Sequence, residues 1–263
     1  MVTIRKTVLL CLALAVPALL AQGPRAPNLQ SENAQALPPQ AEQLFAFANQ
    51  TRADHGLGTL TWDPALAAAA LKHCQRMVVE GPISHRYGGE PDLTSRAGQA
   101  GAHFSLIEEN IAVGANPAKI HQAWMNSPGH RENLLSPDID RVGIAVVQSG
   151  EVIFAVADYS RGVQVMTQAE VEAHFADMLR AKGLTILKDP SPARAYCASS
   201  GRFTGSNAPG FLMRWQNPDI SQLPEGLTAR AASGQYKQAA VGSCPAQDVE
   251  GAFTIYRVAV LLY

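Results

Sequence analysis

The sequence has little charge of either sign and almost no net charge. Charged residues make up 16% of the 263 residues, and the formal net charge is −1. A nucleic-acid interface needs a dense excess of Lys and Arg, so we expect no nucleic-acid partner. Hydrophobic residues nevertheless make up 47% of the chain, which supports one large or two small packed domains.

Two strong enzyme signatures are also missing from the sequence. No His-Glu-x-x-His run is present, which removes the best sequence evidence for a zinc protease helix. No Gly-x-Ser-x-Gly run is present either, which removes the nucleophile elbow of many serine hydrolases. Whether the protein is an enzyme therefore stays open at this point.

A long apolar run occurs at the N-terminus. Arg5 and Lys6 precede the apolar segment 7–21, which ends in small residues and is short for a membrane span. We therefore predict a signal peptide over residues 1–21, cleaved after Ala21, and a secreted or periplasmic protein with no membrane span after cleavage. The alternative is an uncleaved anchor. Residues 22–39 are rich in Pro, Gln, Asn and Ala and are predicted to form a disordered linker.

Cysteine is scarce, with four residues in the chain. Cys11 falls in the predicted signal peptide, and an oxidising compartment would leave one disulfide and one free thiol among the other three. We prefer Cys197–Cys244 as the bonded pair because both lie in the second half. Cys74 lies on an apolar helical stripe and is predicted to be a buried thiol.

Helical and strand patterns follow one another in the first half. Helices are predicted from Ala41, from Asp63-Pro64, and over residues 117–125. Alternating apolar residues at 142–146 and 152–156 flank a Ser-Gly pair and predict a hairpin. Helices followed by an antiparallel pair indicate an α+β layer fold. His73 shares the inner stripe of the second helix with apolar residues, so we expect it in the core.

The segment 124–135, WMNSPGHRENLL, is the most informative stretch. Ser127 is predicted to be a helix N-cap and Pro128 the first helical residue. His130 then falls in the first turn, where the helix dipole favours the neutral imidazole that accepts protons or binds metals. Trp124 is expected in the core.

Three short segments together resemble the CAP superfamily, which comprises cysteine-rich secretory proteins, antigen 5 and pathogenesis-related 1 proteins and is also called the SCP domain. These segments are Ser84-His85, Glu109-Asn110-Ile111 and the Ser-Pro-Gly-His run just described. The match is closest to the bacterial branch and covers residues 44–160. The resemblance implies an α–β–α sandwich over residues 40–162.

The resemblance also implies a cavity that gathers two histidines and two glutamates. By position, His85 and His130 match the histidines and Glu109 matches one glutamate. Ser127 stands where the second glutamate is usual. Two imidazoles and one carboxylate are a donor set that Zn²⁺ accepts, so His85, His130 and Glu109 are candidate zinc ligands. The alternatives are a structural hydrogen-bonded cluster in which Glu109 braces a loop, and catalysis. Ser84 is a weaker candidate, as a nucleophile.

Residues 163–263 form an additional, smaller α+β region. A helix opening at Gln168, Gly183-Leu184, Asp189-Pro190 and then Cys197 repeat the order of landmarks in the first half. The region is predicted to be either a degenerate CAP-like repeat or an unrelated α+β extension closed by one disulfide.

The leading functional hypothesis is a secreted, non-enzymatic CAP-domain protein that binds a small apolar ligand or an extracellular surface. The resemblance implies lipid or sterol binding in some relatives. One alternative is a metal-assisted hydrolase that uses His85, Glu109 and His130, with Glu109 as the base. Another is a structural envelope protein whose second half docks a protein partner, which the sequence does not identify.

Overall fold

The computed structural model describes residues 37–249 and 251–263. The predicted signal peptide and nearly all of the predicted linker lie outside these residues. The first helix begins at Pro39, the last residue of the predicted linker and two residues before the predicted helix start at Ala41. Two four-stranded sheets follow, one in each half of the chain. Within the described residues, no helix is both long and apolar enough to cross a membrane.

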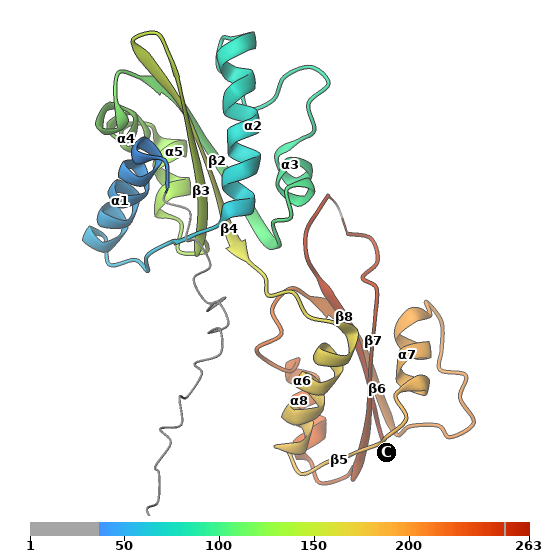
Figure 1. Ribbon diagram of the computed structural model, residues 1–263. Coiled ribbons are helices and arrows are strands. Elements are labelled where there is room, and N and C mark those ends of the chain that lie inside the picture. Colours follow the sequence, from blue (N-terminus) through green and yellow to red (C-terminus); the bar gives the residue numbers. More distant parts are fainter. Residues whose placement is uncertain (1–36, 250) are drawn as a thin grey trace, which may run out of the picture. The chain divides into compact units, whose positions relative to one another are not determined.

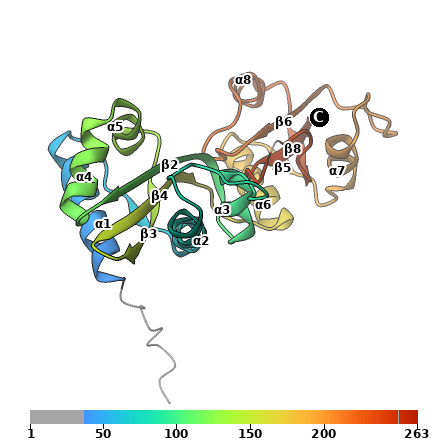
Figure 2. The ribbon, with the colours of Figure 1, turned by 90° about the horizontal axis from the view of Figure 1, so that it is seen from above.

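The first half is an α–β–α sandwich. Its sheet has the order β1-β3-β4-β2, in which β1 runs parallel to β3 and the other neighbours are antiparallel. Helices α1, α4 and α5 lie on one face of this sheet and α2 lies on the other (Figures 1 and 2). The elements are α1 (Pro39–Asp54), β1 (Thr61–Trp62), α2 (Pro64–Glu80), α3 (Leu93–Gln99), β2 (Phe104–Gly114), α4 (Pro117–Asn126), α5 (Pro128–Leu135), β3 (Arg141–Ser149) and β4 (Val152–Gly162).

Local sequence signals account for several of these boundaries. The Asp63 side chain accepts hydrogen bonds from the backbone N–H groups of Ala65 and Leu66 at 2.8 and 3.1 Å, so it caps α2 as predicted. The predicted hairpin forms between β3 and β4, where Gly150 takes a φ of 60°. Trp124 is fully buried with residues of α1, α5 and the sheet, which confirms its place in the core.

The segment that contains Glu109 was assigned no helix or strand from the sequence. Residues 104–114 form the eleven-residue strand β2. Residues 109–112 are all buried, so both faces of the strand are covered. Adjacent glutamates in mid-strand hide the alternation from which a strand is normally predicted. Glu109 is thus held by the ladder of backbone hydrogen bonds to β4.

The second half repeats the topology of the first. Its sheet has the order β5-β7-β8-β6, with β5 parallel to β7 and the other neighbours antiparallel. Helices α6 and α8 lie on one face and α7 on the other (Figure 1). Helices α3 and α5 have no counterpart among the described elements of this half. The elements are α6 (Gln168–Arg180), β5 (Thr185–Ile186), α7 (Ser191–Ala198), β6 (Phe211–Asn217), α8 (Glu225–Ala232), β7 (Gln238–Cys244) and β8 (Tyr256–Leu262).

The same packing detail occurs in both sheets. Gly143 of β3 lies so close to α2 that an added Cβ would come within 2.0 Å of the Ala67 nitrogen. Gly242 of β7 lies equally close to α7, where a Cβ would come within 2.2 Å of the Arg194 nitrogen. A glycine in the third strand therefore lets the helix after the short strand approach the sheet backbone in each half.

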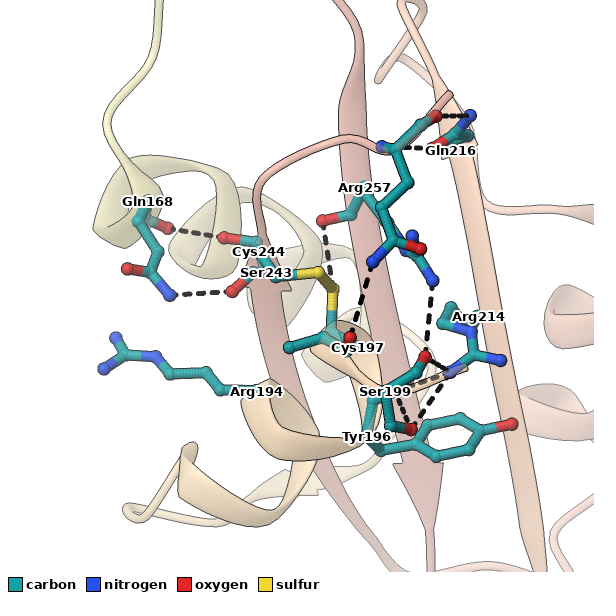
Figure 3. The surroundings of a disulfide bond; sticks show 12 residues. Gln168, Arg194, Tyr196, Cys197, Ser199, Arg214, Gln216, Ser243, Cys244 and Arg257 are labelled. Carbon is teal, nitrogen blue, oxygen red and sulfur yellow. Dashed lines mark hydrogen bonds between the residues drawn. A yellow bond between two sulfur atoms is a disulfide. The ribbon is translucent and has the colours of Figure 1, made fainter. Parts of the chain in front are cut away.

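One disulfide fastens the second half. Cys197 of α7 is bonded to Cys244 at the end of β7, with Cα atoms 5.9 Å apart (Figure 3), which confirms the predicted pair. Cys74 is free and buried, also as predicted. Burial raises the pKa of the Cys74 thiol to about 12, so it is not a reactive thiolate at neutral pH.

Candidate functional site

A polar cluster lies on the face of the first sheet that α2 covers, and Glu109 is at its centre. Glu109 occupies the middle of β2, directly opposite Asp158 on β4. Its side chain is 3% exposed. Neighbouring residues of the same strand face, such as Ile111, pack against Cys74 and Met77 of α2. A carboxylate in this setting needs partners, because an unpaired buried charge is costly.

The first partner of Glu109 is His85. His85 Nδ1 donates to Glu109 Oε1 at 2.8 Å. In the neutral imidazole, a proton on Nδ1 leaves the other nitrogen, Nε2, as the acceptor. The His85 side chain is 60% exposed, in contrast to its buried partner. The structure therefore brings together two of the predicted site residues, with Glu109 fixing the tautomer and orientation of an exposed imidazole.

The second partner of Glu109 is Arg96, which the sequence analysis missed. Its guanidinium donates to Glu109 Oε2 and forms a buried ion pair with it. The same guanidinium donates to the backbone carbonyl of His85 at 3.2 Å. Arg96 lies on α3 and is 7% exposed, and nothing in the local sequence distinguishes it from a surface arginine. It holds both Glu109 and the His85 backbone in place.

His130 lies on α5, which covers the face of the first sheet opposite α2 (Figure 1). It lies in the first turn of α5 as predicted, and its ring centroid is 6.4 Å from that of His85. Burial lowers the pKa of His130, and the neighbouring His85 lowers it further. The neutral imidazole is thus favoured as predicted, although burial rather than the helix dipole is the main cause.

Asn110 positions His130 through the backbone. Its Nδ2 donates to the His130 carbonyl oxygen at 2.8 Å, and its Oδ1 accepts from Asn133 Nδ2 at 3.0 Å. Asn133 Nδ2 also lies 3.2 Å from the Glu109 carbonyl oxygen. The two asparagines therefore tie α5 to β2, which fixes the relative positions of His130 and Glu109.

Ser127 and Ser84 are the two serines that lie close to the site histidines in the sequence. Ser127 is the N-cap of α5 by position, as predicted, but its side chain makes no capping hydrogen bond. Pro128 lacks an N–H, which leaves the helix one fewer donor to cap. The Ser84 hydroxyl donates to the Arg86 carbonyl oxygen at 2.9 Å rather than to His85.

His73 forms a second, fully buried polar pair beneath the first. Its Nδ1 is 2.8 Å from Glu90 Oε1, and its Nε2 is 2.9 Å from the Ser84 carbonyl oxygen. His73 Nε2 also lies 3.9 Å from Glu109 Oε2. The prediction of a core histidine is correct in burial, but the ring is part of a polar network. This network anchors the loop that carries His85.

Asp158 is a second buried carboxylate in the cluster and is not among the predicted site residues. It is fully buried and lies directly opposite Glu109, whereas the nearby Arg161 pairs with Asp138. Burial raises the pKa of Asp158 well above its ordinary value, and the nearby Glu109 carboxylate raises it further. The signal was present, because Phe154, Val156 and Asp158 alternate on one buried face.

The predicted three-residue zinc site does not fit this arrangement. Both Glu109 oxygens already accept hydrogen bonds, and one of them faces a guanidinium, which repels a cation. Over residues 37–249 and 251–263, no group of three or more His, Cys, Asp or Glu side chains is placed to hold a metal ion. His85 Nε2 and the His130 ring remain as two imidazole donors.

Comparison with known proteins agrees with this geometry. The model of the cysteine-rich secretory protein family, CAP, matches residues 45–159. The first half of the chain carries a CAP domain. The matched segment starts in α1, ends in β4, and contains His85, Glu109 and His130. The CAP domain thus occupies less than half of the chain, and the second sheet lies outside it.

The CAP domain is similar to several bacterial proteins. The uncharacterized protein YkwD of Bacillus subtilis is 31% identical over 115 residues, which are 42% of this chain and 44% of that protein. The uncharacterized membrane protein YlbC of the same organism is 34% identical over 110 residues, 40% of this chain and 31% of that protein. This chain therefore spans less than half the length of these two relatives.

One solved structure is an extracellular protein with an SCP domain from Bacillus anthracis. It is 30% identical and covers 47% of this chain and 40% of its own, with a TM-score of 0.43.

Proposed function

We propose that this is a secreted or periplasmic CAP-domain protein that binds its ligand without transforming it. The observation that supports this most directly is the state of Glu109. Both of its oxygens are engaged, by His85 and by Arg96. A general base must have a free lone pair directed at its substrate, and Glu109 would first have to give up a buried ion pair.

The exposed part of the site is suited to recognition. His85 Nε2 is an acceptor held in a fixed direction, and the His130 ring lies beside it. Two adjacent imidazoles can orient the polar group of a small, mainly apolar molecule or of an extracellular surface. The buried network beneath them, from Arg96 to His73, keeps this edge rigid and so limits the entropy lost on binding.

The disulfide supports the proposed location. Cys197–Cys244 is a structural bond, and such bonds persist in oxidising compartments outside the cytoplasm. The basic and then apolar pattern of residues 1–21 is that of a secretory signal. N-terminal sequencing of the protein exported by its host should therefore find Gln22 first. Retention of Met1 would contradict the proposed secretion.

A metal-assisted hydrolase is the second candidate, and one observation favours it. A carboxylate that accepts from one imidazole nitrogen leaves the other directed outward, an arrangement often found behind metal-ligating histidines. Glu109 would then orient His85 rather than act as a ligand itself. Two imidazoles without a third protein donor make a weaker site than the usual three-ligand set.

The two candidates are separated by measuring turnover and zinc binding together. The purified protein is screened against mixed peptides and esters, with and without a chelator, and zinc is titrated by calorimetry. We expect no chelator-sensitive turnover and no zinc binding that depends on His130. His130→Ala is the test variant and the exposed His55→Ala is the matched control. Thermal melts check that both remain folded.

The outcomes are distinct. Turnover that a chelator abolishes and that His130→Ala lacks would overturn the binding proposal in favour of the hydrolase. Equal zinc affinity in wild type and His130→Ala would rule out a metal at this pair. Native mass spectrometry of the protein from its producing cells tests binding directly, since a retained ligand appears as added mass that His85→Ala loses.

A further inference from the structure

The second half contains a cavity in a place where the CAP domain has a helix. In the CAP domain, the connection from α2 to β2 includes α3, and Ala97 of α3 packs with Leu66 of α2 and Phe104 of β2. The corresponding connection from α7 to β6, residues 199–210, contains no helix or strand. A cavity of about 780 Å³ opens between this connection, α7 and the sheet. Its volume is within the usual range for small-molecule sites.

The wall of this cavity is apolar and aromatic. Leu187, Tyr196, Phe203 and Tyr263 line it and pack against the buried cluster of Ala193, Ala240 and Leu261. The Tyr196 and Phe203 rings meet nearly edge to face, with centroids 6.3 Å apart. Such a surface favours a ligand with a flat or extended apolar body.

Contacts behind the wall hold Tyr196 in position. The Arg214 guanidinium lies 4.8 Å from the Tyr196 ring centroid and donates to the Tyr196 carbonyl oxygen at 2.8 Å (Figure 3). The adjacent Cys197 is fixed to β7 by the disulfide. The aromatic wall is therefore formed before a ligand arrives, which reduces the entropic cost of binding.

The rim of the cavity has cationic side chains. Lys188 and Arg202 line it and are exposed. Asp189 also lines it, but its carboxylate accepts from the backbone N–H of Ser191 at 2.9 Å at the start of α7. The rim therefore carries two positive side chains and one negative side chain, and the negative one already accepts a hydrogen bond. This balance favours an anionic group on the ligand.

We propose that this cavity binds a small amphipathic anion, with its apolar body against Tyr196 and Phe203 and its anionic group near Lys188 and Arg202. This site shares no residue with the His85–Glu109–His130 cluster. It goes beyond the binding function proposed for the CAP domain, and its test does not depend on that function.

The probe is 1-anilinonaphthalene-8-sulfonate, a fluorescent aromatic anion. We expect saturable binding at one molecule per protein. Tryptophan introduced from either wall, by Ala195→Trp on α7 or Thr204→Trp in the connection, should fill part of the cavity and reduce affinity at least tenfold. Ala198→Trp is the matched control, because Ala198 is exposed on α7 but outside the cavity lining. Thermal melts confirm that each variant is folded.

Separate variants test whether the cavity prefers an anionic ligand. Lys188→Gln and Arg202→Gln should each weaken sulfonate binding about two- to fivefold, as expected for exposed ion pairs, and Lys182→Gln should not. The neutral probe N-phenyl-1-naphthylamine should bind these variants and wild type alike. Decanoate and decyl phosphate should displace the sulfonate, and competition between them shows whether a carboxylate or a phosphate is preferred.

Three results would overturn the proposal. Wild-type protein that gives no saturable fluorescence has no such site. Unchanged binding in both Ala195→Trp and Thr204→Trp would place the probe elsewhere. Equal weakening of the neutral and anionic probes by Arg202→Gln would reject the anionic preference. The zinc and turnover measurements on the CAP domain are unaffected by any of these results, so the two proposals can fail independently.

Discussion

Removing the disulfide should destabilise the second half by a predictable amount. The perturbation is the double variant Cys197→Ala with Cys244→Ala. The bond joins residues 47 positions apart and so closes a loop that contains β6 and α8. In the chain-entropy model, a loop of this length corresponds to about 4 kcal/mol of stability, because the unfolded chain regains the freedom that the bond removes. For a unit of about 100 residues, this lowers the melting temperature by roughly 20 °C.

The assay must report on the two sheets separately. Urea unfolding followed by hydrogen exchange and mass spectrometry does so, because peptides from β6, β7 and β8 report on one sheet and peptides from β2, β3 and β4 on the other. We expect the first group to lose protection at lower urea in the double variant, while the second changes little. Wild-type protein with a reductant is the control and should match the double variant.

Equal urea midpoints for the two proteins in the β6–β8 peptides would refute the reasoning. That result would mean that packing alone fixes α7 against the sheet. A loss of protection in both sheets together would instead contradict the assumption that the two halves unfold independently.

Three further changes test the packing around the site. Arg96→Met should lower the free energy of unfolding by about 3–5 kcal/mol, because it leaves the Glu109 charge buried and unpaired; urea denaturation measures this, and a change below 1 kcal/mol would contradict the ion pair. The raised pKa of Asp158 means that wild type loses stability as pH rises above the unfolded pKa of about 3.9 and through the folded pKa. Asp158→Asn should therefore be the more stable protein at pH 7.5, by on the order of 1–3 kcal/mol, and lose this advantage near pH 4; equal pH dependence would show that Asp158 is ionised in the folded state. Gly143→Ala should cost about 1–3 kcal/mol in thermal melts, because its Cβ would overlap the Ala67 backbone, whereas an unchanged melting temperature would show that α2 can shift freely.

Much of the first half could be predicted because its signals are local. Asp63 caps a helix with its own side chain, and Gly150 permits the hairpin turn, so each acts within a few residues of the sequence. The three residues of the predicted site, His85, Glu109 and His130, were found by resemblance to a family rather than by their spacing. The family match over residues 45–159 supports the resemblance itself.

The identity of the disulfide was predictable for a different reason. With Cys11 in the predicted signal peptide and Cys74 on an apolar stripe, Cys197 and Cys244 were the natural pair. The order of landmarks in the second half also suggested a repeat. The common strand order of the two sheets gives that suggestion a structural basis, although the missing counterparts of α3 and α5 could not be seen in the sequence.

The sequence by itself determined which groups are available, and the tertiary structure decided what they do. Glu109 is a plausible metal ligand or base in the sequence, but Arg96, from a different element, occupies one of its oxygens and His85 the other. Asp158 is an ordinary carboxylate in the sequence, and only the sheet buries it fully and places it directly opposite Glu109. Charge and hydrogen-bonding capacity belong to the residue, whereas burial and the choice of partner arise only when strands and helices distant in the sequence pack together.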